Sequence, residues 1–175
     1  LMHALSGDSF RKMAELGVVE VLERLKAEGR IKYLGFSFHD SYEAFEEILC
    51  YRDWDFCQIQ LNYMDAESQA GLKGYRLTEE RNVPLVIMEP VKGGSLAAFA
   101  EDITGKFRAL DPEASVASYA LRWVGSLPNV KVILSGMSTM EQVEDNLKTF
   151  TDFRSISDEE TKTIDDIVAL IRSRV

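Results

Sequence analysis

The side chains of this sequence that could do chemistry stand at the ends of four short apolar runs. They are hydroxyl, amide, imidazole and ammonium groups, which can hold a polar ligand, together with glycines whose backbone N–H groups can approach a phosphate. In chain order these polar tails are Ser37-Phe38-His39-Asp40, Asn62-Tyr63-Met64-Asp65, Glu89-Pro90-Val91-Lys92-Gly93-Gly94 and Ser135-Gly136-Met137-Ser138. Ligands of parallel α/β folds sit at the carboxyl ends of the strands, so the tails form a candidate binding edge.

The runs before these tails have the composition of buried strands. They are Ile31–Phe36, Cys57–Leu61, Pro84–Met88 and Val130–Leu134, each followed by a helical pattern, and the first three residues read as the end of a further strand. Strands that alternate with helices predict an α/β fold with a parallel sheet, here of about four and a half strand–helix units. An open doubly wound sheet and a closed barrel both remain possible. No G-x-G-x-x-G follows any strand, which argues against a dinucleotide-binding Rossmann sheet.

Several helix starts can be predicted from capping pairs. These pairs are Asp40 with Glu43, Asp111 with Pro112, Ser138 with Glu141, and Ser157 with Glu160. The segment 91–110 is predicted to be a long connection, and loops of that length inside a domain are usually functional.

Composition limits the classes of partner. A chain of 175 residues predicts one domain, and its net charge of −9 argues against nucleic acid or an anionic membrane as the main partner. No apolar run approaches the ~20 residues of a membrane span, and no signal peptide is visible. Cys50 and Cys57 have no C-x-x-C spacing and are predicted to be buried free thiols, which favours a cytoplasmic protein. We predict no metal site.

The polar tails, taken in order, resemble the aldo-keto reductase family. The motifs that carry the resemblance are Leu1-Met2-His3, Gly35-Phe36-Ser37-Phe38-His39, Gln60-Leu61-Asn62-Tyr63, Met88-Glu89-Pro90-Val91-Lys92-Gly93-Gly94, Val132-Ile133-Leu134-Ser135-Gly136 and Glu141-Gln142-Val143-Glu144-Asp145-Asn146-Leu147. The resemblance implies a TIM (β/α)8 barrel, present here only as its C-terminal half, with residues 1–175 as one partial barrel domain. It is closest to the subgroup that continues into a C-terminal iron–sulfur domain. None of the cluster cysteines is present here, so an iron–sulfur cluster is implied only for an extension after Val175.

The family resemblance implies an oxidoreductase that transfers a hydride between a nicotinamide cofactor and a carbonyl or alcohol substrate. Four residues of the family catalyse this reaction, and only the histidine has a counterpart, His3; the resemblance places the Asp, Tyr and Lys before residue 1. We therefore expect the isolated chain to be inactive. The alternatives are that His3 is merely a frayed terminal residue, and that the chain is a non-catalytic nucleotide-binding or anion-binding α/β module.

The resemblance also implies contacts with NADP or NAD. For the nicotinamide end it implies Ser37, His39, Gln60 and Met88. For the phosphates it implies Pro90, Lys92, Gly93, Gly94 and Ser95. For the adenosine end it implies Ser135, Gly136, Ser138, Gln142, Asp145 and Asn146. The choice between NADP and NAD stays open because neither Gly136 nor Gln142 is basic.

Each assignment has a structural alternative. Ser37 could cap the following helix, Gln60 could belong to a structural network like its neighbour Gln58, and Met88 could be a core residue. The glycines after Lys92 could serve a turn with positive φ.

The partners expected are a small carbonyl substrate and the dinucleotide. Half a barrel leaves two strand edges unpaired, so self-association, or pairing with the missing N-terminal half, is also expected.

Overall fold

The computed structural model describes residues 1–174. Its elements are β1 (Met2–Leu5), α1 (Gly7–Glu15), α2 (Val18–Ala27), β2 (Gly35–Phe38), α3 (Tyr42–Tyr51), β3 (Phe56–Gln60), α4 (Gly71–Glu80), β4 (Leu85–Met88), the short 3-10 turn η1 (Lys92–Gly94), α5 (Glu101–Leu110), α6 (Val116–Gly125), β5 (Val130–Ile133), α7 (Met140–Thr151) and α8 (Asp158–Arg172). They form two compact units, the first made of Leu1–Gln60, Ala66–Met88 and Asn129–Val132, and the second of Leu61–Asp65, Glu89–Pro128 and 133–174.

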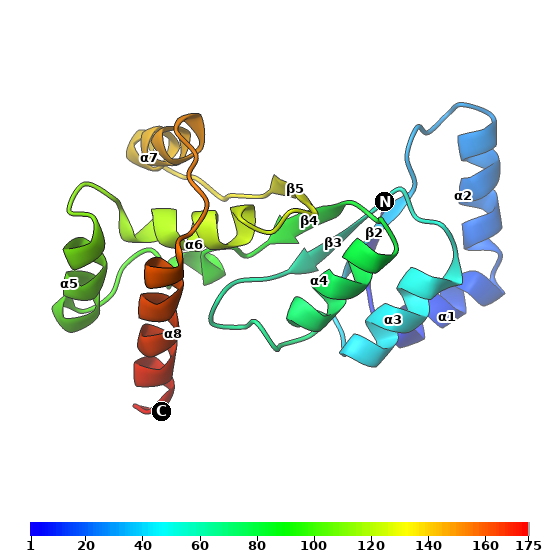
Figure 1. The fold of residues 1–175 in the computed structure, drawn as a ribbon. Helices are drawn as coiled ribbons and strands as arrows, with labels where there is room; N and C mark the ends of the chain where they lie inside the picture. Colours follow the sequence, from blue (N-terminus) through cyan, green and yellow to red (C-terminus); the bar gives the residue numbers. More distant parts are fainter. Residues whose placement is uncertain (175) are drawn as a thin grey trace. The chain divides into compact units, whose positions relative to one another are not determined.

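The first unit contains a sheet whose strands follow the chain order β1-β2-β3-β4-β5 (Figure 1). The pairs β1–β2, β2–β3 and β3–β4 are parallel. The prediction of a parallel sheet in sequence order, with helical crossovers, is therefore confirmed.

One face of this sheet is covered by helices α1, α3 and α4 (Figure 1). Phe36 and Phe38 of β2 pack against Phe45 of α3, with ring centroids 6.0 and 5.2 Å apart. Cys57 and Ile59 of β3 are fully buried, while Phe56, Gln58 and Gln60, which alternate with them, are half-buried. The strand period of two thus turns Cys57 and Ile59 toward the helices and Gln58 and Gln60 toward the opposite face.

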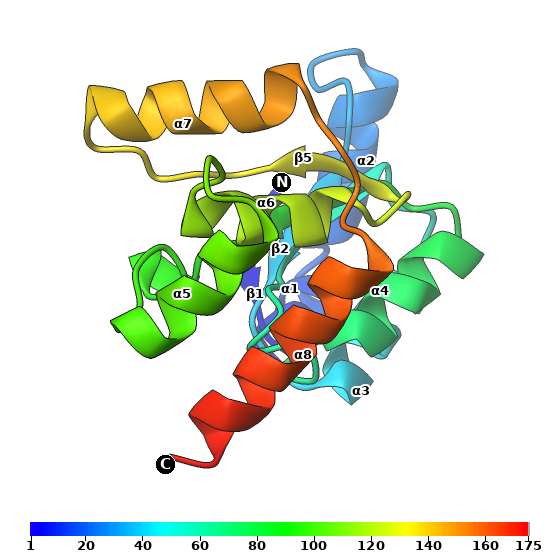
Figure 2. The same ribbon diagram turned by 60° about the vertical axis from the view of Figure 1, so that its left-hand side comes forward.

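The second unit is built around α5, α6 and α8 (Figure 2). Its core joins Tyr63, Leu96, Ile103, Phe107, Tyr119, Ala120, Ile164 and Ile167. The α8 start predicted from Ser157 and Glu160 is confirmed as a capping box. Helix α7 has no buried residue, and Met140, Leu147 and Phe150 on it are exposed.

Other helix-start predictions were wrong. Ser41, not Asp40, caps α3, because the Asp40 carboxylate instead accepts the N–H of Gly7 at 2.9 Å in the first turn of α1. That bond and one from the Ser41 N–H lower the pKa of Asp40. Helix α6 begins after Ser115 rather than at Asp111.

Two further predictions about segments were wrong as well. The connection 91–110 is not a structureless loop, since it holds η1 and α5. Strand β2 begins at Gly35 rather than Ile31, because Asp55 holds the chain at Leu34: its carboxylate accepts the Leu34 N–H at 2.7 Å and pairs with Lys26 at 2.5 Å.

The cysteine prediction was right in part. Both thiols are free, but Cys50 is exposed, since it lies on the outer side of α3, and only Cys57 is buried. Burial raises the pKa of the Cys57 thiol, which makes it a poor nucleophile. Among residues 1–174, no helix is long and apolar enough to cross a membrane.

The close contact between β2 and β3 gives a stability prediction. A Cβ on Gly35 would lie 2.5 Å from the carbonyl oxygen of Phe56. Gly35→Ala must therefore push the two strands apart, and we expect urea denaturation to show a loss of about 1–3 kcal/mol in the free energy of unfolding. Gly105→Ala in α5 is the matched control, because a Cβ there meets nothing within 4 Å. Equal stability of the two variants would contradict the close-packing argument.

Candidate functional site

The sheet face opposite the helices carries the polar residues that the sequence singled out. The register places Ser37, Gln58 and Val86 side by side, and Gln60 beside Met88 in the next row toward the carboxyl ends. Apart from Ser37, which is fully buried, these side chains are half-buried. The structure thus brings Ser37, Gln60 and Met88 onto one face at the predicted edge.

His3 joins this face through Ser37. The Ser37 hydroxyl lies 3.0 Å from Nδ1 of His3 and accepts the backbone N–H of Ala4 at 2.7 Å. The pairing of β1 with β2 shifts register between Met2 and Leu5, and Ala4 has φ 50°. Because of this bulge both His3 and Ala4 are exposed, instead of alternating between the two faces.

The side chains of Gln60 and His39 are held less firmly than that of Ser37. The Gln60 side-chain oxygen accepts a long hydrogen bond, 3.4 Å, from the amide of Gln69. The backbone N–H of His39 donates to the carbonyl oxygen of Leu5 at 2.9 Å, while the side chain of His39 is exposed. Amide and imidazole groups placed in this way can still turn toward a polar ligand.

In the second unit, the loop after β4 has an unusual backbone. Glu89 and Lys92 have φ of 55° and 49°, and Gly93 and Gly94 have φ of 61° and 94°. Left-handed conformations at non-glycine residues are strained and gather at functional sites. The Lys92 ammonium lies 2.5 Å from the Asp65 carboxylate, so its charge is already paired. Gly93 and Gly94 supply the positive φ of this turn, and a phosphate at Lys92 would have to compete with the Asp65 carboxylate.

Asn62 holds this loop; the sequence placed it in a polar tail of the candidate edge but indicated no separate role for it. It is fully buried; its Oδ1 accepts the N–H groups of Met64 and Asp65, and its amide nitrogen donates to the carbonyl oxygen of Glu89 at 3.1 Å. An Asn followed two and three residues later by bonded N–H groups is an Asx turn, and that turn tendency of Asn was the available signal. Pro90 is buried in the same loop, and the Ser95 hydroxyl donates to the Lys92 carbonyl.

The segment predicted for the adenosine end is capped by its own side chains. Thr139, rather than Ser138, is the N-cap of α7, and Gln142 completes the capping box by accepting the N–H groups of Ser138 and Thr139 at 2.7 and 3.2 Å. A bond from its own backbone N–H and one from Thr139 lower the pKa of Glu141. A carboxylate in the first turn disfavours a second anion there. Ser135 accepts a hydrogen bond from Asn146 at 3.0 Å, and Gly136 is exposed.

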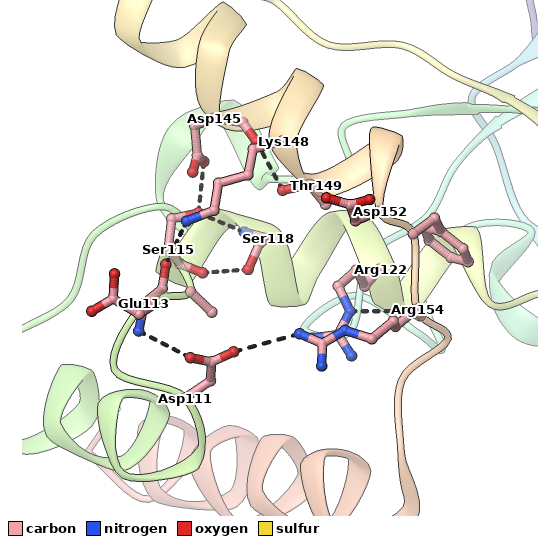
Figure 3. A pocket seen from close by; sticks show the side chains of 12 residues that line it. Asp111, Glu113, Ser115, Ser118, Arg122, Asp145, Lys148, Thr149, Asp152 and Arg154 are labelled. Atoms are coloured by element: carbon pink, nitrogen blue, oxygen red, sulfur yellow. Dashed lines mark hydrogen bonds and ion pairs between the residues drawn. The ribbon is translucent and has the colours of Figure 1, made fainter.

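Asp145 lines a cavity of about 530 Å³ within the second unit (Figure 3). Its carboxylate accepts the Ser115 hydroxyl at 2.6 Å, while Lys148 donates to the Glu113 carbonyl and Arg154 pairs with Asp111 at 3.6 Å. Asp145 and Lys148 each bond to a neutral group across the α6–α7 contact, and Arg154 is paired with Asp111, so the cavity wall is a helix contact rather than an evident anion site. Among residues 1–174, no group of three or more His, Cys, Asp or Glu side chains could hold a metal.

The fold defines a class of protein through its similarity to solved structures. The chain superposes on an aldo-keto reductase of Bacillus halodurans with a TM-score of 0.68 and 22% identity, covering 85% of this chain and 55% of that one. It superposes on an aldo/keto reductase of Klebsiella pneumoniae, in complex with NADP and acetate, with a TM-score of 0.67 and 23% identity, covering 86% and 53%. An aldose reductase of Giardia lamblia gives a TM-score of 0.62 at 18% identity, covering 86% and 49%.

These structures identify the chain as a partial (β/α) barrel that spans about half of their length. No curated protein matches it. The model of the aldo/keto reductase family matches residues 9–169. The chain belongs to the aldo/keto reductase family.

Proposed function

We propose that this chain supplies the nicotinamide-binding edge of an aldo-keto reductase barrel, with residues 1–175 as one partial barrel domain. The observation that carries the proposal is the shared polar face of the first unit, with His3, Ser37, Gln60 and Met88 at its carboxyl edge. Solved relatives in complex with NADPH or NADP support a nicotinamide cofactor.

The residues of the polar face fit the nicotinamide of such a cofactor. The residues predicted for its phosphates fit those phosphates less well. A bound nicotinamide cofactor would supply a hydride to the carbonyl carbon of the substrate. With this group bound, His3 would donate a hydrogen bond to the carbonyl oxygen of the substrate, the side-chain amide of Gln60 and the ring of His39 would hold the carboxamide, and Met88 would pack against the nicotinamide. Lys92 is paired with Asp65, and the N–H groups of Ser138 and Thr139 before α7 bond to Gln142, so phosphate and adenosine contacts there would have to displace these partners.

In this proposal the isolated chain binds the cofactor weakly and does not turn over. Titration of the ¹⁵N-labelled chain with NADPH, followed by NMR, should give saturable shifts at the Gln60 side chain, with Kd no tighter than about 1 μM. Gln60→Ala should weaken binding. Gln58→Ala is the matched control, because Gln58 lies on the same face one row further from the edge.

The outcomes separate the alternatives. Nanomolar binding with reductase turnover would contradict the proposed inactivity. Binding without any effect of Gln60→Ala would favour a nucleotide-binding or anion-binding module that uses another surface. Absence of binding would remove the dinucleotide as a partner of this chain.

We further propose that the chain self-associates. Strands β1 and β5 lie at the two edges of the sheet, and Val132 and Leu134 at the β5 edge are 47% and 43% exposed. Unpaired strand edges with apolar side chains recruit another chain. Light scattering at tens of micromolar should give a mass of at least a dimer, whereas a stable, cooperatively folding monomer would refute this prediction.

A further inference from the structure

The bulge in β1 places two different groups within hydrogen-bond distance of one hydroxyl, that of Ser37. The backbone N–H of Ala4 and Nδ1 of His3 both meet Oγ of Ser37, at 2.7 and 3.0 Å. A serine hydroxyl has one proton to donate and can accept two hydrogen bonds. The Ala4 N–H can only donate, so it occupies one of the acceptor positions of Oγ.

The remaining question is where the Ser37 proton goes. Ser37 is fully buried, and the His3 ring nitrogen is the acceptor within its reach. If Nδ1 carried a proton, it would donate to Oγ, and the buried hydroxyl proton would be left without an acceptor. An unsatisfied buried donor costs about 1–3 kcal/mol, so the arrangement with bare Nδ1 is preferred.

We infer that Ser37 is a positioning residue that holds His3 in the tautomer protonated at Nε2. The hydroxyl donates to Nδ1, so the neutral ring presents one donor, the Nε2–H, on the ring edge that faces away from Ser37. His3 itself is exposed. Resting on the proposed function, this commits the Ser37 proton to the histidine and leaves the second acceptor position of Oγ for the NH2 group of a cofactor carboxamide.

The bulge in β1 explains how the Ser37 hydroxyl can contact both the His3 ring and the Ala4 N–H. In a regular strand the N–H of Ala4 would serve the ladder, and residues 3 and 4 would point to opposite faces. The left-handed φ of Ala4, 50°, turns its N–H toward the Ser37 hydroxyl while His3 stays within reach. Bulges beside active sites commonly re-aim a side chain in this way.

The experiment reads the tautomer directly by NMR. The chain contains two histidines, so a long-range ¹H–¹⁵N spectrum of the labelled protein at pH 8 shows two rings. His3 should show a pyridine-type Nδ1 and a pyrrole-type Nε2. His39 is the internal control, because among residues 1–174 no hydrogen bond of its ring is seen, and it should populate both tautomers.

Substitution of Ser37 then tests whether its hydroxyl sets the tautomer of His3. Ser37→Ala should move His3 to the mixed pattern of His39, and Ser37→Thr, which keeps the hydroxyl, should restore the single tautomer. If neither variant folds, the wild-type chain still decides: the slowly exchanging Ser37 hydroxyl proton should show a nuclear Overhauser effect to Hε1 of His3.

Each other outcome overturns the inference. A protonated Nδ1 in the wild type, a His3 pattern equal to that of His39, or a Ser37→Ala pattern unchanged from wild type would do so. None of these readouts needs a bound cofactor. Failure of nucleotide binding would therefore reject the proposed function while leaving the tautomer result intact.

Discussion

Replacing Arg122 with methionine is expected to lower the free energy of unfolding by about 3–5 kcal/mol. The Arg122 guanidinium is buried and binds both carboxylate oxygens of Glu160, at 2.7 and 2.8 Å, and it also donates to the carbonyl oxygens of Arg154 and Ser155. Removing it leaves a carboxylate that is only 13% exposed without its partner, and two carbonyls without a donor. Urea denaturation of the two proteins measures the difference.

The matched control is Arg108→Met. Arg108 pairs with Glu101 at 2.7 Å, but their side chains are 55% and 76% exposed, so this variant should lose at most about 1 kcal/mol. The double variant Arg122→Met with Glu160→Met should be more stable than Arg122→Met alone, because it removes the orphaned charge. Equal losses for Arg122→Met and Arg108→Met would show that the pair is not effectively buried.

The same pair predicts how stability depends on pH. Burial raises the pKa of Glu160, but hydrogen bonds from Arg122 and Ser157, with the charge of Arg122, outweigh it and bring the pKa below the usual 4.5. A depressed folded-state pKa means that the contribution is present above 4.5 and is lost as the pH falls through the folded-state value. Glu160→Gln should therefore flatten the acid side of the stability profile. An unchanged acid limb would contradict this account.

The sequence predicted the sheet well, because strands that bury one face against helices need apolar residues there. It misplaced the start of β2, because Lys32 and Tyr33 stay exposed and Asp55, more than twenty residues later, fixes the chain at Leu34. Such a long-range bond leaves no periodic trace in the sequence. The caps of α3 and α7 were misplaced by one residue, since adjacent polar residues compete for the same N–H groups.

The candidate site was predictable in residue type but not in contact. His3 and Ser37 were both singled out, yet their meeting depends on a bulge in β1, and nothing in the sequence around Ala4 indicates a positive φ. Likewise Lys92 was chosen for its charge, whereas the structure pairs it with Asp65, which lies 27 positions earlier. Residue types limit which chemistry is possible, while tertiary pairing decides which groups remain free for a ligand.

Asn62→Ala is expected to cost about 2–5 kcal/mol of the free energy of unfolding and to loosen the loop after β4. The substitution leaves the N–H groups of the half-buried Met64 and Asp65 without their acceptor, each at about 1–3 kcal/mol. The Glu89 carbonyl loses one donor but keeps the N–H of Lys92 at 3.1 Å, so it adds little to the loss.

Hydrogen exchange locates this effect. In Asn62→Ala the amides of Met64 and Asp65 should lose their protection, because Oδ1 of Asn62 is the acceptor that shields them. Asn146→Ala is the matched control: it removes a half-buried amide with one bond to Ser135 and should cost no more than about 1.5 kcal/mol. If both variants lost the same stability, or if Met64 and Asp65 stayed protected without Asn62, the Asx turn would not be what holds this loop in its strained conformation at Glu89 and Lys92.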